Sequence, residues 1–423
     1  MLGLSPRAPF SVGRRAPTAS LEARVLLLLA ALLPACAGPG DDTADPLAGL
    51  VLVQEDPSDA PFRDLSAEWM ERFDLGDVAF EAPFRSSQGL GPAYIRSSCA
   101  SCHADDARGP GMVTKMVVLD DPEAESELLP WGNTERPYVA GGATTPLVRP
   151  DDPRVEISTR APPAVFGRGY LEAIDEAEVR ALASSQAEAG RVSGRVNEVV
   201  CNFEANDESL FPTCSTGATV MGRFGLKARV PTLDGFAADA YQGDMSITSP
   251  MRPDELANPD GLLDDDRAGV DIDLETVNVT GDYMRLLDIP PREPLEEEGA
   301  ALFADLGCAD CHTPSLRTRA DWPVPQLAGI DAPIYSDLLL HDMGEGFSDG
   351  LSDGGALPSE WRTSPLIGLR HLRYYLHDGR ADSVDAAIVA HGGAGSEALF
   401  SADLYAHASP ADRETLLRYV ESL

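Results

Sequence analysis

The sequence predicts a mainly α-helical protein built from two similar units, with long loops and little β-sheet. Two observations support this fold class. The five-residue pattern Cys-x-x-Cys-His occurs at residues 99–103 and again at residues 308–312, so the chain contains two related sites. Apolar residues recur at helical spacing in several segments, whereas strand-like alternation is confined to short runs, and stretches rich in Pro and Gly separate these elements.

The expected elements follow one another from residue 61 onward. In order, they are a helix and a turn within residues 61–84, a turn at 86–92, a short strand at 112–119, a long loop at 121–153, and helices at 176–189, 274–288, 295–306 and 409–423. Pro294 can start the helix before the second pattern, and Gly307 ends it next to Cys308. The last helix is amphipathic, so one of its sides is expected in a core.

The repeated pattern has the spacing that a c-type haem requires. Its two thiols can form thioether bonds, and its imidazole can bind the iron from one side. A zinc site built from the cysteine pairs is the alternative, which the His directly after the second Cys disfavours. We therefore predict two covalently bound haem c groups, in cytochrome c-like domains at residues 61–290 and 291–423. The predicted attachment residues are Cys99, Cys102, Cys308 and Cys311, and the predicted iron ligands within the patterns are His103 and His312.

The N-terminus has the features of an export signal. Four Arg precede an apolar run at residues 25–33, which is too short to span a bilayer permanently, and small residues follow it. Leu33-Pro34-Ala35-Cys36 resembles a bacterial lipobox, so residues 1–36 are predicted to be a lipoprotein signal peptide with a lipid anchor on Cys36; plain cleavage nearby is the alternative. Residues 37–60, rich in Gly, Asp, Pro and Ala, are predicted to be a flexible linker. We therefore predict a periplasmic or cell-surface protein that contacts the membrane only through this anchor.

Two cysteines remain once the haem-attaching pairs and Cys36 are set aside. Cys201 and Cys214 are close in sequence, and an oxidising compartment allows them to form a disulfide. A free or metal-binding role for the two thiols is the other interpretation.

The chain is strongly acidic, with 69 Asp and Glu against 33 Lys and Arg and a formal net charge of -36. Such an excess argues against nucleic acid and anionic membrane surfaces as partners. A solvated acidic surface explains the charge, and docking of a basic redox partner is the other interpretation.

Asp264, Asp266 and Glu275 have part of the spacing of a calcium loop, but Ala268 and Ile272 occupy positions that should provide oxygen ligands, so a solvated helix start is expected there.

The sixth ligands of the two irons are constrained by where histidines occur. No His lies between His103 and His312, so the first haem is open, bound by a Met, or reached by a His of the other unit; we expect an open site. Candidates for the second haem are His341, Met343, His371, His377, His391 and His407. Of these, His371 and His407 are expected at the surface.

Several short runs occur in a fixed order over most of the chain after the signal. They are Gly89–Pro92 with Ser98–His103, Gly222–Ala228 with Pro231–Leu233, Gly243–Met245, Tyr335–Gly344, and Tyr375–Arg380 with His391–Gly393. Together they resemble the di-haem oxidoreductases that are described as peroxidases or thiol oxidoreductases. That family is distantly similar to bacterial di-haem cytochrome c peroxidases and to the di-haem enzyme that matures methylamine dehydrogenase.

The resemblance implies a division of labour between the two haems. Peroxide would react at the haem on His103, and the haem on His312 would pass or store electrons. Asp244 matches the acid that lies over the reacting haem in the peroxidases, so it is the predicted catalytic residue. His391 falls where the peroxidases place a Met ligand, so His391 is the predicted sixth ligand of the second haem and Met343 is its rival. His377 is expected to be a structural or inter-haem contact.

The predicted function is therefore that of a haem-dependent oxidoreductase, specifically an exported peroxidase that reduces hydrogen peroxide. Its electrons would come from a small redox donor, a cytochrome or a cupredoxin. Two alternatives are a di-haem cytochrome that only carries electrons and an oxidase that acts on a small molecule or a protein side chain. An open coordination site on the first haem separates the peroxidase from the carrier.

Overall fold

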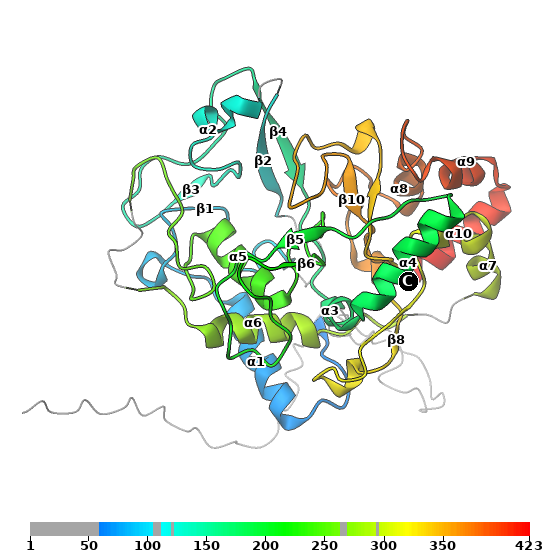
Figure 1. Ribbon diagram of the computed structural model, residues 1–423, viewed down its shortest axis with the longest axis horizontal. Helices are drawn as coiled ribbons and strands as arrows, with labels where there is room; N and C mark the ends of the chain where they lie inside the picture. The colour runs from blue at the N-terminus through cyan, green and yellow to red at the C-terminus, as the bar shows by residue number, and fades with distance from the viewer. Residues whose placement is uncertain (1–58, 105–110, 120–121, 263–268, 293–295) are drawn as a thin grey trace, which may run out of the picture. The chain divides into compact units, whose positions relative to one another are not determined.

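The structure is a computed structural model that describes residues 59–104, 111–119, 122–262, 269–292 and 296–423 (Figure 1). The α-helices within these ranges are α1 (Ala67–Glu81), α2 (Glu125–Leu128), α3 (Arg168–Ala173), α4 (Glu176–Ala189), α5 (Leu233–Met245), α6 (Leu274–Leu286), α7 (Glu297–Asp305), α8 (Val384–Ala390), α9 (Leu399–His407) and α10 (Pro410–Glu421). The strands are β1 (Ala93–Tyr94), β2 (Val113–Val118), β3 (Tyr138–Val139), β4 (Val155–Arg160), β5 (Glu198–Val200), β6 (Thr219–Met221), β7 (Leu316–Arg317), β8 (Asp331–Ala332), β9 (Leu340–Asp342) and β10 (Glu360–Arg362). Helix is therefore the main regular structure, and the predicted fold class is confirmed.

Side-chain caps explain where several helices begin. Asp175 accepts a hydrogen bond from the backbone of Ala177 at the start of α4, and Asp273 accepts one from Thr276 at the start of α6. Ser409 caps α10, in which Pro410 takes the first helical position. Asp273 belongs to the acidic run of the sequence, so the expected helix start there is confirmed, whereas Asp264 and Asp266 lie outside the described residues.

The sheets are short antiparallel pairs. Within the described residues, β1 pairs with β3, β2 with β4, β5 with β6, β7 with β8, and β9 with β10. The longest ladder joins β2 to β4 over six residue pairs, from Val113 opposite Arg160 to Val118 opposite Val155. The strand expected at 112–119 is confirmed. The loop expected at 121–153 is only partly correct, because it contains the short α2 and β3.

Helices α1, α3 and α5 all pack against α6 (Figure 1). Phe73 of α1 and Tyr283 of α6 lie with ring centroids 5.0 Å apart, and Phe80 of α1 lies 5.1 Å from the same Tyr283 ring. A glycine allows the close approach, since a Cβ on Gly76 would collide with the backbone of Val279. Burying each of these large aromatic side chains contributes about 1.5–3 kcal/mol.

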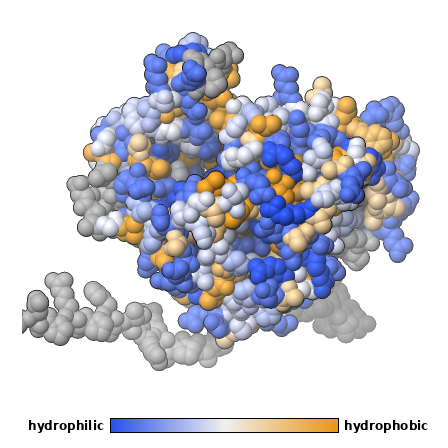
Figure 2. All heavy atoms as spheres, viewed as in Figure 1, coloured by the Kyte–Doolittle hydropathy of each residue, from blue (hydrophilic) through white to orange (hydrophobic). Residues whose placement is uncertain are grey.

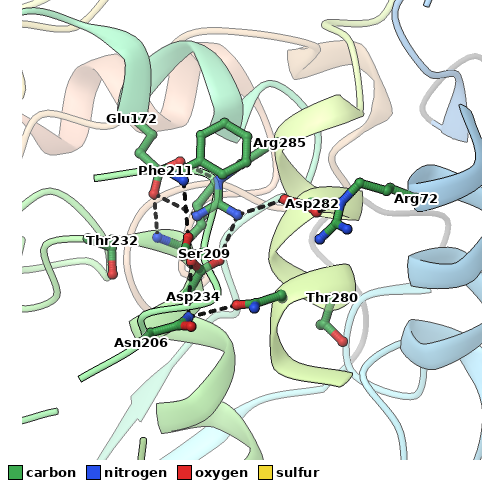
Figure 3. Close-up of polar contacts among 12 residues, drawn as sticks. Arg72, Glu172, Asn206, Ser209, Phe211, Thr232, Asp234, Thr280, Asp282 and Arg285 are labelled. Atoms are coloured by element: carbon green, nitrogen blue, oxygen red, sulfur yellow. Dashed lines mark hydrogen bonds and ion pairs between the residues drawn. The ribbon is translucent and has the colours of Figure 1, made fainter. Parts of the chain in front are cut away.

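A buried ionic cluster holds three of these helices together (Figure 3). Arg285 of α6 is fully buried, and its guanidinium donates to Glu172 of α3 at 2.6 Å and lies 2.6 Å from Asp234 of α5. Asp282, one turn earlier on α6, completes the set at 3.0 Å from Arg285 and also pairs with Arg72 of α1. A buried Arg with carboxylates on two other helices fixes their relative positions, because removing either charge leaves the other unpaired in the core.

Helices α7, α8 and α10 form a second packed group in the last third of the chain. This group buries Phe303 of α7 with Tyr419 of α10 and with Tyr335, which lies outside the helices. The hydroxyls of Tyr335 and Tyr419 lie 2.9 Å apart.

The described residues all belong to one compact unit, residues 54–423, and the largest core cluster contains residues from both predicted domains, for example Phe166 and Leu327. The proposed division at residue 290 stays a prediction.

Other predictions concern the export of the chain. Cys201 and Cys214 form a disulfide, which confirms that pairing. Cys36, residues 1–36 and nearly all of the 37–60 segment lie outside the described residues. In the part of the chain that the structure describes, no helix has both the length and the apolar character needed to cross a bilayer. On the face drawn in Figure 2, hydrophilic residues are spread over the whole surface with hydrophobic ones in between.

Candidate functional site

The second Cys-x-x-Cys-His motif begins directly after α7. Gly307 adopts a left-handed conformation, with a φ of 79°, and turns the chain from the helix into a short 3-10 turn at Cys308–Asp310. The backbone N–H of His312 donates to the carbonyl of Cys308 at 3.0 Å, which closes the motif into a loop. Both thiols and the imidazole therefore belong to one compact turn.

A cavity of about 240 Å³ opens beside this turn. Cys308, Cys311 and His312 line one part of it, and His391 and Met343 also line it. Most of the remaining wall is apolar, and its apolar residues include Phe303, Leu366, Ile367, Leu369, Leu372, Ile388 and Val420. An apolar cavity whose wall carries two cysteines and several imidazoles suits a large, flat, metal-containing ligand.

His312 and His391, which both line the cavity, each have one ring nitrogen already engaged. His312 Nδ1–H donates to the carbonyl of Tyr335 at 3.1 Å, and His391 Nδ1–H donates to the carbonyl of Ala387 at 2.7 Å. Burial and the nearby His391 lower the pKa of His312 to about 4, and burial lowers the pKa of His391 as well. Both side chains are thus neutral imidazoles whose Nε2 is left for a metal, which is the form that ligates iron.

The first motif follows β1 and is half-buried. The backbone N–H groups of Cys102 and His103 donate to the carbonyl of Cys99 at 3.0 and 2.9 Å, so the local turn resembles that of the second motif. Gly111 packs against this turn, since a Cβ on it would lie 2.7 Å from the Cys102 sulfur. The ring of Phe80 lies 6.1 Å from that of His103.

Asp244 lies at the end of α5, close to the first motif. The backbone N–H of Ile95 donates to the carbonyl of Asp244 at 2.7 Å, which ties this end of the helix to the segment leading into the motif. Burial, followed by the charge of Asp244, raises the pKa of Cys102 to about 11. Burial also raises the pKa of Asp244 itself to about 6, against the opposing effect of Lys115. The first motif therefore has a carboxyl group beside it that can exchange a proton near neutral pH.

A family model described as "Di-haem oxidoreductase, putative peroxidase" matches residues 140–423, which is more than half of the chain. The chain belongs to the di-haem oxidoreductase family. The predicted resemblance is thus confirmed, and the chain is a haem-dependent oxidoreductase. The matched region contains the second motif and Asp244 but begins after the first motif.

This di-haem oxidoreductase is also similar, at low sequence identity, to several solved structures. The di-haem peroxidase BthA from Burkholderia thailandensis is 16% identical with a TM-score of 0.39, covering 88% of this chain and 89% of its own in the Y463M variant. A MauG-like protein associated with microbial copper homeostasis is 13% identical with a TM-score of 0.39, over 87% and 92% of the two chains. Hydrazine synthase of Kuenenia stuttgartiensis is 14% identical with a TM-score of 0.34, over 92% and 100%. No curated protein matches the chain.

Membership of a di-haem family implies two haem groups, and the residues of the second motif fit one of them. Cys308 and Cys311 are thiols, and burial raises the pKa of Cys308 to about 12. Among the described residues, the one group of three side chains whose potential metal-ligating atoms lie close together is Cys311, Asp337 and His341, so the two cysteine pairs do not meet in a zinc site. The cavity, the thiols and the neutral His312 together favour haem over zinc.

The sequence made His341 a candidate iron ligand, but in the structure both of its ring nitrogens are hydrogen-bonded to carboxylates. Its ring is buried, and Nε2 and Nδ1 donate to Asp337 and Glu397, both at 2.8 Å. Burial alone would lower its pKa, but the hydrogen bond to Asp337 and those to Cys311 and Glu397 raise it to about 12. His341 is therefore an imidazolium with both nitrogens engaged and is not available to iron. Sequence reasoning missed this clamp because Glu397 lies 56 residues away from His341.

His377 stacks on Trp361 at the cavity wall. The two ring centroids are 3.8 Å apart with an angle of 16° between the planes. The ammonium of Lys227, which is fully buried, lies 4.0 Å from the Trp361 ring and donates to the carbonyls of Leu357, Pro358 and Glu360. The packing agrees with a structural contact for His377. Of the two residues predicted at the surface, His407 is exposed and His371 is partly exposed.

A chain of ion pairs connects α5 with this wall. Its members, in order, are Asp239, Arg229, Asp353, Arg160, Asp349 and Lys227. Asp239 and Arg229 act on the pKa of Asp244, and Lys227 lies over Trp361. The ion pairs therefore run from α5, the helix that carries Asp244, to Lys227 beside the cavity wall.

Proposed function

We propose that this chain is an exported peroxidase that reduces hydrogen peroxide at a haem c held by the first motif, with electrons supplied through a haem c held by the second. The observation that supports this proposal most strongly is the contrast between the two motifs. A carboxyl group with a pKa of about 6 lies beside the first, whereas the imidazole of His391 lines the cavity beside the second. A proton-transferring group suits the haem that reacts, and a second ligand suits the haem that transfers electrons.

In this proposal, each motif holds its haem covalently. Cys99 and Cys102 form thioethers to one haem, Cys308 and Cys311 form them to the other, and His103 and His312 bind the irons. When bound, such a haem supplies one-electron redox chemistry and promotes cleavage of a peroxide O–O bond. The role of the chain is to bind peroxide near Asp244 and to move protons.

Asp244 acts as a general base and then as a general acid. Its carboxylate accepts the proton from the oxygen of hydrogen peroxide that binds at the first site, and it returns that proton to the oxygen that leaves as water. Two electrons and two further protons complete the reduction of one peroxide to two waters. The pKa of about 6 favours this exchange, because the carboxyl group changes its protonation state close to neutral pH.

At the second site, His391 is the proposed sixth ligand. Its Nδ1–H is held by the carbonyl of Ala387 at 2.7 Å, which fixes the ring and leaves Nε2 available. Met343 also lines the cavity and remains the rival ligand, which would raise the reduction potential relative to a second imidazole.

We also propose that the protein is periplasmic or on the cell surface, attached by a lipid on Cys36. The disulfide between Cys201 and Cys214 supports an oxidising compartment. The net charge of -36 favours a basic electron donor, such as a small cytochrome or a cupredoxin.

The test is peroxide turnover by the haem-loaded protein with a chemical electron donor. Asp244→Asn removes the proton-accepting group with little change in shape, and we expect turnover to fall about 10²–10⁴-fold. Asp254→Asn makes the same change at an exposed carboxylate and should leave turnover as in the wild type. Wild-type protein that carries both haems but does not consume peroxide, or an Asp244→Asn variant with full turnover, would contradict the proposal.

A further inference from the structure

The wall of the second cavity differs in charge from the rest of the molecule. The whole chain has 69 Asp and Glu against 33 Lys and Arg. The described residues that line the cavity nevertheless include two Arg, Arg168 and Arg362, and no Asp or Glu. Although acidic residues outnumber basic ones about twofold in the whole chain, the charged residues among the described lining of this apolar cavity are all basic. Such a lining is complementary to an apolar ligand that carries carboxylates.

Arg362 is the better defined of the two. It is the last residue of β10 and is 5% exposed. The segment that starts at Arg362 lines the cavity as far as Ile367. Its Nη1 donates to the carbonyl of Thr363 at 3.0 Å, and its Nε donates to the carbonyl of Gly225 at 3.3 Å. The guanidinium is thus held in place by backbone carbonyls alone.

Within the described residues, no carboxylate lies within ion-pair distance of Arg362. Asp337 is the acidic group that acts on its pKa, but the carboxylate of Asp337 is engaged by His341 and by Gln186, each at 2.8 Å. Burial lowers the pKa of Arg362 to about 10, so the guanidinium stays charged. By comparison, the fully buried Arg285 has three carboxylates around it.

A buried cation without a counter-ion is costly, and the cost disappears when a ligand brings the missing charge. Haem carries two propionate carboxylates on an otherwise apolar ring. We propose that Arg362 binds a propionate of the haem that the second motif holds. This inference rests on the proposed attachment of haem to Cys308 and Cys311. A guanidinium matches a carboxylate with parallel donors, so Arg362 neutralises the propionate and fixes the rotation of the haem within the cavity.

The experiment compares Arg362→Met with Arg223→Met in the haem-loaded full-length protein. Arg223 is a matched control, because it is buried, donates to the carbonyl of Leu171, has a pKa that burial lowers to about 10, and does not line the cavity. The readouts are the number of attached haems, the propionate bending mode in resonance Raman spectra, and the reduction potential of each haem by potentiometric titration. None of these depends on turnover.

For Arg362→Met we expect two attached haems, a shifted propionate mode, and a lower reduction potential for the second haem, because a positive charge beside it has been removed. Arg223→Met should leave the Raman mode and the second potential as in the wild type. Arg362→Lys keeps the charge without the paired donors, so we expect a smaller Raman shift and a potential near that of the wild type.

An unchanged propionate mode in Arg362→Met, with both haems attached, would overturn the inference. If that variant fails to fold, an unshifted mode in Arg362→Lys would overturn it instead. Wild-type protein without a haem on the second motif would overturn the proposed function, and this inference with it, so the two failures are distinguished by the haem count alone.

Discussion

The two Cys-x-x-Cys-His motifs of this di-haem oxidoreductase have the same local turn and different surroundings. The second lies at an apolar cavity in which His312 and His391 both have Nδ1 bonded to a carbonyl. The first lies beside Asp244, whose pKa is about 6, and no His occurs in the sequence between the two motifs. In the proposed function, the motif specifies attachment of haem, whereas the residues around it specify whether that haem reacts with peroxide or transfers electrons.

The largest expected effect is on attachment, where the two motifs should behave alike. Replacing Cys308 and Cys311 by Ser removes both thioether donors, so the intact chain should lose the mass of one haem. Replacing Cys99 and Cys102 should remove the other haem. Mass spectrometry of the denatured protein measures this directly. As a control, replacing Cys201 and Cys214 by Ser removes the disulfide and should leave two haems attached. Loss of a haem from this control variant would contradict the assignment. Retention of both haems in either motif variant would contradict it as well.

The next effect separates the motifs, because it concerns the sixth ligand of the second haem only. His391→Ala removes the proposed sixth ligand, so one low-spin ferric signal should be replaced by a high-spin signal in the EPR spectrum. Met343→Leu keeps the volume of the side chain and should leave the spectrum unchanged. A high-spin signal in Met343→Leu, with an unchanged spectrum in His391→Ala, would instead identify Met343 as the ligand.

A third prediction concerns the framework of the first site, which depends on the cluster in Figure 3. Arg285→Met leaves Glu172, Asp234 and Asp282 without their shared cation, and we expect a loss of about 3–5 kcal/mol in the free energy of unfolding. Urea denaturation measures the loss. Arg317→Met breaks an exposed pair with Asp331 and should cost at most about 1 kcal/mol. Equal costs for the two variants would show that the buried cluster does not stabilise the fold.

The smallest effect is a pH dependence confined to the first site. Only the ionised Asp244 can accept a proton, so the rate constant for peroxide consumption should rise with pH and level off above about 6, falling by up to about tenfold per pH unit below it. Asp244→Asn should flatten this rise. A profile that keeps the same inflection in the variant would assign the titration to another group.

Local sequence patterns predicted much of the fold and little of the detail around the sites. The helix at 176–189 and the strand within 112–119 were correct, because capping residues and apolar spacing are properties of a short segment. The pairing of β2 with β4 and the clamp of His341 by Glu397 were not predictable, because both depend on contacts between residues far apart in the chain.

The candidate site shows the same division. The predicted attachment residues come from the spacing of the motif itself, and His391 and Met343, which the family resemblance indicated as candidate ligands, both line the second cavity. Arg362 carried no sequence signal, since its significance arises from the absence of acidic residues among those described around the cavity. A single sequence does not reveal which charges remain unpaired after folding.

In the proposed function, the first haem is open and the second is closed by a protein ligand. The most direct measurement is the EPR and absorption spectrum of the fully haem-loaded ferric protein, with and without cyanide. We expect one high-spin haem per chain, converted by cyanide to a low-spin form, beside one low-spin haem that cyanide does not affect. Two low-spin haems, neither of which binds cyanide in the ferric or the half-reduced state, would contradict it and favour a protein that only carries electrons.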